Sequence, residues 1–202
     1  MAQRKWQHRL LKALRSGRVK AVWLGTPCST FSRARRGPRN RPGPPPPLRS
    51  TALPWGLDDL AHAEQQVVDI SNKLVRFTLT VIRTCIKLRI GVAVENPMSS
   101  ILWQIPELQA LLSQHGQNSV TDFCGWGERW RKSTRIFSWN LDLTECMRRC
   151  TGRSICSFSN KEHICLSGTD ASGVWWTKRA EAYPLRWCSK LSQSIDKQCN
   201  RT

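Results

Sequence analysis

Residues 19–28, VKAVWLGTPC, decide the fold of this chain. Residues 19–24 are rich in β-forming side chains and predict a short buried strand, which Gly25-Thr26-Pro27-Cys28 brings to an end. The preceding segment, from Trp6 to Leu14, spaces its apolar residues as a helix does, and Ser16-Gly17 ends that helix. The chain is therefore predicted to begin with a helix, a tight turn, a strand and a loop.

A long helix and a second strand follow. The helix is predicted over residues 63–88, and a second strand, Val92-Ala93-Val94, stops at Glu95-Asn96-Pro97. Open α/β sheets place ligands at the carboxyl ends of parallel strands, so Glu95 is expected beside Cys28. The helix is predicted to bury one stripe of apolar residues: Val67, Ile70, Leu74, Phe77, Val81, Cys85 and Leu88.

The rest of the chain predicts a smaller number of elements. A helix is expected over residues 105–112 and strands over 119–123 and 134–139, with Gly125-Trp126-Gly127 as a hairpin turn. We predict three regions: residues 1–140 with a basic, proline-rich loop at 33–57, a Cys-rich insert at 141–180, and a C-terminal helix and tail at 181–202.

The charge of the chain indicates a polyanionic partner. Thirty-two Lys and Arg residues against fourteen Asp and Glu residues give a formal net charge of +18 and a pI of about 10.4. This balance favours nucleic acid first and an anionic membrane second. No apolar run is long enough to span a membrane, so a membrane protein is not expected.

The cysteines and the N-terminus indicate the compartment. Nine cysteines form no obvious disulfide framework, and residues 1–18 alternate basic and apolar side chains without the apolar core of a secretion signal. We therefore expect a reduced, intracellular protein, and the basic charge suggests the nucleus.

Two residues stand out for their chemistry. Cys28 follows a proline at the end of a strand and precedes a basic loop, surroundings that favour the nucleophilic thiolate. Glu95, at the end of the next strand, could be held protonated there and donate to a base ring. The structural alternatives are a small buried cysteine and a solvated loop glutamate, and the residues alone leave both open.

Three motifs in order carry a family resemblance. Gly25-Thr26-Pro27-Cys28-Ser29-Thr30-Phe31-Ser32 resembles the catalytic-loop motif of C5-cytosine DNA methyltransferases. Val94-Glu95-Asn96-Pro97 is similar to their Glu-Asn-Val motif, and residues 131–137, RKSTRIF, resemble their later Gln-x-Arg-x-Arg motif. The resemblance implies a Rossmann-like, three-layer α/β methyltransferase fold that uses S-adenosylmethionine. It also implies that residues 1–140 are a methyltransferase-like catalytic region and that residues 141–180 are either a Cys-rich insert or a target-recognition-like segment.

The resemblance also implies site residues. Cys28 would add to C6 of a flipped cytosine, Glu95 would contact N3 and the exocyclic amine, and Arg135 would orient the base or the loop. Pro27 would lie against the cofactor. Basic residues of the loop would hold the phosphates of DNA, or of RNA as the alternative: Arg33, Arg35, Arg36, Arg39 and Arg41, with Arg49 at the end of the loop.

The glycine-rich donor loop of the family lies upstream of its Pro-Cys motif, and residues 1–27 hold no such loop. We therefore expect a fold that is incomplete at its cofactor half, with a small Cys-rich appendage and a complementing N-terminal chain as one partner. The functional hypotheses are methyl transfer to cytosine, or a non-catalytic nucleic-acid-binding remnant.

The Cys-rich segment also contains candidate metal ligands. Cys146, Cys150, Cys156 and His163 could surround one Zn²⁺, but their spacing fits no standard knuckle. Free thiols in a small appendage are favoured, so the sequence assigns no metal, with these four residues as the weak candidates.

Overall fold

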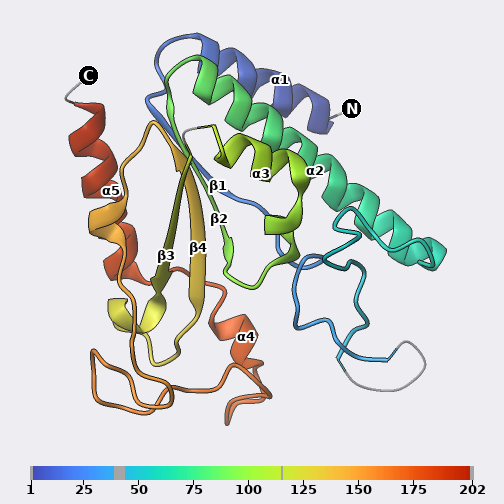
Figure 1. Cartoon of the computed structure of the whole chain (residues 1–202), viewed down its shortest axis with the longest axis vertical. Helices are drawn as coiled ribbons and strands as arrows, with labels where there is room; N and C mark the ends of the chain where they lie inside the picture. The colour runs from blue at the N-terminus through green and yellow to red at the C-terminus, as the bar shows by residue number, and fades with distance from the viewer. Residues whose placement is uncertain (1, 39–43, 115, 201–202) are drawn as a thin grey trace. The chain divides into compact units, whose positions relative to one another are not determined.

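The structure is a computed structural model that describes residues 2–38, 44–114 and 116–200 (Figure 1). The chain forms two compact units. The first contains Met1–Asn118 and Ile136–Leu141, and the second contains Ser119–Arg135 and Asp142–Thr202. Residues 119–135 thus group with the C-terminal part of the chain, whereas the sequence analysis places them in the first region.

The chain has a mixed α/β architecture built on an open, four-stranded mixed sheet. Strand β1 pairs in parallel with β2, with Gly25 opposite Glu95 in the register. This confirms the predicted parallel pairing of the first two strands. The order across the sheet is β1 (Ala21–Gly25), β2 (Gly91–Pro97), β4 (Ser133–Trp139) and β3 (Gln117–Asp122) (Figure 1).

The helices of the first unit follow the predicted pattern. They are α1 (Ala2–Arg15), α2 (His62–Lys87), the 3₁₀ turn η1 (Ile101–Gln104) and α3 (Pro106–Leu112). Helix α1 ends where Gly17 takes a left-handed φ of 74°, a conformation that glycine adopts without strain. At the start of α2, the Glu64 carboxylate accepts a hydrogen bond from the Ala61 backbone N–H at 3.1 Å.

The buried face of α2 differs from the predicted stripe in its first half and at its last residue, because Leu88, which follows the end of the helix, is 41% exposed. Val81 and Cys85 are buried as expected, but Val67 and Ile70 are 50% and 58% exposed. The buried positions there are Val68, Ser71, Val75 and Leu79. The buried face includes the polar Ser71, which hydrogen-bonds to the loop after β1. A pattern built on apolar residues alone therefore selects the wrong side of this helix half.

A matched pair of substitutions tests this assignment. Val75→Ala, on a side chain that is 1% exposed, is expected to lower the free energy of unfolding by about 1–3 kcal/mol, because it leaves a cavity. Val67→Ala, at a half-exposed position of the same helix, is expected to change it by less than about 0.5 kcal/mol. Urea denaturation followed by circular dichroism measures both values, and equal losses would contradict the assignment.

Tryptophans take part in the core of the first unit. Trp103 is 1% exposed, and its ring centroid lies 4.5 Å from that of Phe137. Trp139 is 2% exposed and donates its indole N–H to the Leu111 carbonyl at 2.9 Å. These indoles are therefore packing residues rather than platforms for stacking on a base.

The second unit has little regular structure. Its helical elements are η2 (Phe123–Trp126), η3 (Thr144–Cys146), α4 (Trp176–Arg179) and the predicted C-terminal helix α5 (Leu185–Cys199). Between β3 and β4, Gly127 ends η2 with a φ of 102°, so Gly125-Trp126-Gly127 forms a 3₁₀ turn. Within the described parts of the chain, none of the helices combines the length and the apolar character needed to cross a bilayer.

Candidate functional site

The loop after β1 holds Cys28 in an anchored turn. The Phe31 N–H donates to the Cys28 carbonyl at 2.9 Å, and Phe31 itself is fully buried in the core. The Phe31 carbonyl in turn accepts a hydrogen bond from the Ile101 N–H at 2.9 Å. Cys28 is half-buried at the start of this turn. Its backbone position is therefore fixed by the burial of the residue three positions later.

The end of β2 brings Glu95 and Asn96 to the same edge of the sheet as this turn. Glu95 is 6% exposed and Asn96 is 1% exposed. The Asn96 side-chain amide donates to the Thr26 carbonyl at 2.6 Å and to the Glu95 carbonyl at 3.1 Å. Asn96 thus ties the ends of the two strands together, a role that the sequence analysis missed. Its buried Oδ1 has no hydrogen-bond partner within the described residues.

Arg49 has a different role from the one expected. It is 2% exposed, so it does not contact phosphates as the sequence analysis supposed. Its guanidinium stacks over the Phe31 ring at 3.8 Å and donates to Thr30 Oγ1 at 3.1 Å and to Asn72 Oδ1 at 2.8 Å. Burial lowers the pKa of Arg49 to about 10. Arg49 therefore holds the Cys28 turn against α2.

A shallow depression of about 310 Å³ lies beside the Cys28 turn. Its lining includes Ser32, Arg33, Arg35, Ser50 and Thr51, whose hydroxyl and guanidinium groups suit an anion. Neither Cys28 nor Glu95 lines it, so it adjoins the strand ends rather than covering them.

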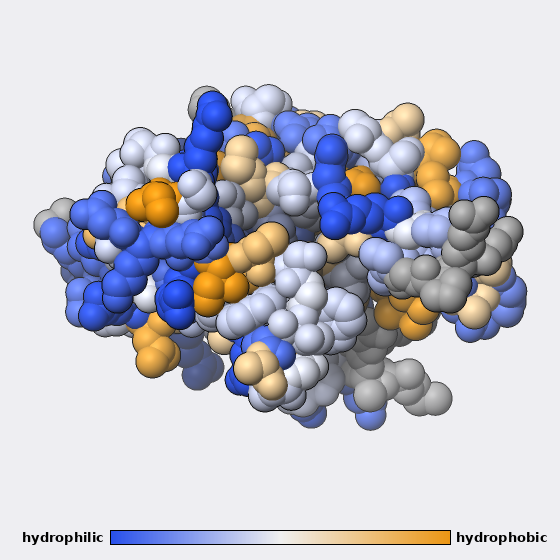
Figure 2. Space-filling view, turned by 90° about the horizontal axis from the view of Figure 1, so that it is seen from below, coloured by the Kyte–Doolittle hydropathy of each residue, from blue (hydrophilic) through white to orange (hydrophobic). Residues whose placement is uncertain are grey.

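The remaining arginines of the basic loop fall into two groups. Arg33 and Arg36 are exposed, and Arg35 is half-buried with its Nε donating to the Pro46 carbonyl at 2.9 Å. Arg39 and Arg41 lie outside the described residues. Figure 2 shows a face on which hydrophilic residues predominate and apolar residues form separate groups.

The other two residues predicted from the resemblance are placed as follows. Pro27 is exposed in the loop after β1. Arg135 lies in β4 and belongs to the second unit, and its burial lowers the pKa of its guanidinium. Cys28 and Glu95 are therefore the two predicted catalytic residues that one unit brings to a common edge.

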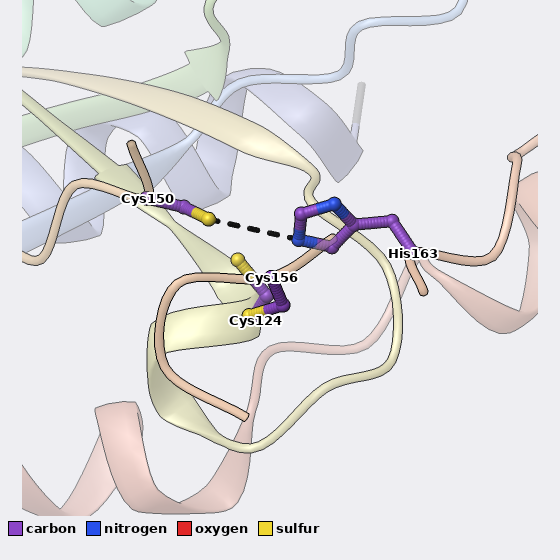
Figure 3. A group of neighbouring side chains, drawn as sticks. All are labelled: Cys124, Cys150, Cys156 and His163. Atoms are coloured by element: carbon purple, nitrogen blue, oxygen red, sulfur yellow. Dashed lines mark hydrogen bonds between the residues drawn. The ribbon is translucent and has the colours of Figure 1, made fainter. Parts of the chain in front are cut away.

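A second group of reactive side chains lies in the second unit (Figure 3). Cys124, Cys150, Cys156 and His163 converge, and their four ligand atoms all lie within 4.8 Å of one another. The weak metal candidates of the sequence analysis included Cys146 instead of Cys124, and this was wrong for Cys146. That residue is buried elsewhere, with its Sγ 3.7 Å from the Lys190 carbonyl.

The thiols of this group differ in their electrostatic surroundings. Burial raises the pKa of Cys124, and hydrogen bonds to Cys150 and Cys156 raise it further. Burial also acts to raise the pKa of Cys156, but hydrogen bonds from Ser159 and from backbone N–H groups, together with the neighbouring His163, outweigh it and lower that pKa to about 6. One cluster thus contains both a strongly protonated thiol and an acidic one.

No family model, curated protein or solved structure matches this chain.

Proposed function

We propose that the chain is a C5-cytosine methyltransferase-like protein with a Rossmann-like α/β fold, in which Cys28 attacks a cytosine base of DNA. The observation that carries this proposal is the parallel pairing of β1 and β2 with Gly25 opposite Glu95. It brings a half-buried thiol and a buried carboxyl to one edge of the sheet, where α/β proteins perform their chemistry. The resemblance of both loops to family motifs supplies the identity of the substrate.

The chemistry begins with a cytosine that has left its helix, because C6 is out of reach inside the stack. The Cys28 thiolate forms a bond to C6, the electrons of the C5–C6 double bond move into the ring, and the Glu95 carboxyl donates a proton to N3. The resulting enamine is nucleophilic at C5. A proton from water adds at C5 and leaves hydroxide. The hydroxide then removes the original C5 hydrogen, the sulfur departs as thiolate, and N3 returns its proton to the Glu95 carboxylate, which restores the ring.

Three features of the site support these roles. Asn96 links Thr26 to the end of β2, which fixes the approach of the two loops. Arg49 and the buried Phe31 hold the Cys28 turn, so little reorganisation is needed at the reacting sulfur. Exposed Arg33 and Arg36, together with the polar depression, provide positive charge for the phosphate backbone next to the base.

Whether the residues of this chain fit a methyl donor is a separate question. The resemblance implies S-adenosylmethionine, which the family holds in a glycine-rich loop. The Gly-x-Gly at residues 125–127 does not suit this purpose, because a Cβ on Gly125 would lie 2.8 Å from the Arg148 Cβ in a closed 3₁₀ turn. The described residues therefore do not fit a donor site of the family's kind. Methyl transfer stays an expectation of the resemblance, and no step above depends on it.

Hydrogen exchange at C5 tests the adduct without a methyl donor. DNA with deuterium at C5 of its cytosines is incubated with the purified chain, and loss of deuterium is followed by mass spectrometry. We expect exchange with the unmodified chain, none with Cys28→Ser, and rates about 100-fold lower with Glu95→Gln. Cys165→Ser, on an exposed cysteine, is the matched control and is expected to exchange normally.

Absence of deuterium exchange with both single-stranded and duplex DNA would contradict the Cys28–cytosine adduct.

The net charge of +18 favours the second function, a nucleic-acid-binding protein without catalysis. In that case Cys28→Ser would bind DNA or RNA as tightly as the unmodified chain, with an affinity that falls steeply with salt. Unchanged exchange in Cys28→Ser would exclude Cys28 as the nucleophile.

A further inference from the structure

The Cys–His group of the second unit has the composition and closeness of a metal site. Three sulfur atoms and one imidazole nitrogen lie within 4.8 Å of one another, and the Cys150 Sγ is 3.7 Å from the His163 Nε2 (Figure 3). In a tetrahedral zinc site with Zn–S bonds of ~2.3 Å and Zn–N bonds of ~2.0–2.1 Å, neighbouring ligand atoms are separated by roughly 3.6–3.8 Å. The sulfur–nitrogen distance of 3.7 Å is therefore close to one edge of such a tetrahedron.

The imidazole of His163 is oriented as a metal ligand. Its Nδ1 lies 3.0 Å from the Arg153 carbonyl, so the proton is held on Nδ1 and the lone pair is left on Nε2, the nitrogen that faces the sulfurs. A backbone carbonyl on the second ring nitrogen is the usual outer partner of a ligating histidine. Without a cation, the partners of the Nε2 lone pair in this group would be thiols, which are weak hydrogen-bond donors.

Backbone turns bring the ligands together from three separate segments. Cys124 comes from η2, and Cys150 lies in the loop after η3. Cys156 and His163 lie on the two arms of a small hairpin, in which the Cys156 N–H donates to the Lys161 carbonyl at 2.8 Å and the His163 N–H to the Ser154 carbonyl at 2.8 Å. The hairpin thus places two ligands on neighbouring strands of one turn.

The sulfur of Cys150 is also prepared to carry negative charge. It accepts hydrogen bonds from the Ser157 N–H and the Ser157 hydroxyl, both at 3.4 Å. Such donors stabilise a thiolate bound to a metal and help to fix its orientation.

We propose that Cys124, Cys150, Cys156 and His163 bind one structural Zn²⁺. All four positions of the tetrahedron are filled by protein, and the three cysteines are buried, which leaves no position open for a substrate. Closed Cys₃His sites of this kind stabilise small domains rather than catalyse reactions. Apart from α5, the described part of the second unit has helical turns of three or four residues and isolated β-bridges, so a metal is a suitable crosslink for it.

A disulfide is the chemical alternative for three neighbouring thiols. It would join two cysteines and leave the third thiol and the oriented imidazole without a function. All three cysteines are free in the structure. The zinc proposal uses all four side chains, whereas the disulfide uses two.

Metal analysis of the full chain tests the proposal. The protein is produced in zinc-supplemented medium, purified under reducing conditions and measured by inductively coupled plasma mass spectrometry. We expect one zinc per chain in the unmodified protein and none in Cys124→Ser. Cys146→Ser is the matched control, because Cys146 is also a buried cysteine of the second unit but lies outside the group. It is expected to keep its zinc.

A spectroscopic measurement on the unmodified chain guards against a variant that merely fails to fold. Replacement of Zn²⁺ by Co²⁺ is expected to give the intense visible absorption of a tetrahedral thiolate site, and a chelator is expected to abolish it. The absence of stoichiometric zinc together with the absence of this absorption would overturn the proposal. Loss of zinc in Cys146→Ser and its retention in Cys124→Ser would also overturn it, in favour of the other ligand set.

Discussion

Replacing Asp122 by alanine is expected to lower the stability of the second unit by about 3–5 kcal/mol. Asp122 is fully buried at the end of β3, with its carboxylate accepting hydrogen bonds from the Ser133 hydroxyl at 2.5 Å and the Cys150 N–H at 2.8 Å. The carboxylate also pairs with Arg131 and Arg149, whose Nε atoms lie 3.7 Å and 3.4 Å away. Its removal leaves these donors without their acceptor, and buried donors without partners are costly.

Hydrogen–deuterium exchange followed by mass spectrometry checks this prediction, because it separates the two units. Peptides from residues 142–200 are expected to exchange faster in Asp122→Ala. Asp196→Ala, on an exposed carboxylate of α5, is the control and is expected to leave exchange unchanged. Equal protection in both variants would show that the buried carboxylate contributes little.

Arg49→Ala is expected to destabilise the first unit by about 3–4 kcal/mol. The substitution leaves a cavity over Phe31 and removes the donor to Thr30, Asn72 and the Pro54 carbonyl. Because the guanidinium holds the Cys28 turn, the Cys28-dependent exchange of cytosine deuterium is also expected to fall. Thermal unfolding followed by circular dichroism measures the first effect, and the exchange assay measures the second.

Two further variants define what Arg49 contributes. Arg49→Lys keeps the positive charge but lacks the planar guanidinium. Its free energy of unfolding is therefore expected to lie between those of the unmodified chain and Arg49→Ala. Arg36→Ala removes an exposed arginine of the same loop and is expected to change stability by less than about 0.5 kcal/mol. If Arg49→Ala were as mild as Arg36→Ala, the positioning role of Arg49 would be wrong.

Local patterns in the sequence predict the strand–helix–strand part of the fold. β-Branched and aromatic residues before Gly25 indicate β1, and the short apolar run before Glu95 indicates β2. Both strands end at residues that stop strands, so their polar ends and their parallel pairing could be inferred. The position of Glu95 next to the end of β1 therefore follows from local chemistry.

Buried polar residues account for the features that the sequence did not predict. Arg49 stands in an arginine-rich loop, which suggests a phosphate contact. Its burial and its hydrogen bond to Asn72, on a helix 23 positions later, identify it as a core residue. Ser71 is a polar residue on the buried face of α2, where it hydrogen-bonds to Thr30. A search for apolar residues alone therefore does not find this face. Asn96 donates to the backbone carbonyl of Thr26. Every residue has such a carbonyl, so the sequence does not show which residue accepts the hydrogen bond.

The metal candidates show a related limit of sequence reasoning. Cys150, Cys156 and His163 were found because they lie close together along the chain. Cys124 lies outside the Cys-rich segment, in the turn between β3 and β4, so a search of that segment alone selects Cys146 in its place. One feature of the sequence does point to Cys124, because it comes directly before Gly125-Trp126-Gly127. In the structure, this glycine turn packs closely against Arg148, two residues before Cys150.

The interleaving of the two units has a consequence for synthesis on the ribosome. The first unit includes residues 136–141, which emerge only after residues 119–135 of the second unit. Neither unit can therefore complete its contacts as one continuous stretch of nascent chain. In the proposed zinc site, Cys124 is synthesised first, and the ligand set is complete only when His163 has left the exit tunnel. Zinc binding at the proposed site is therefore a late step of synthesis, which needs all of residues 124–163 outside the ribosome.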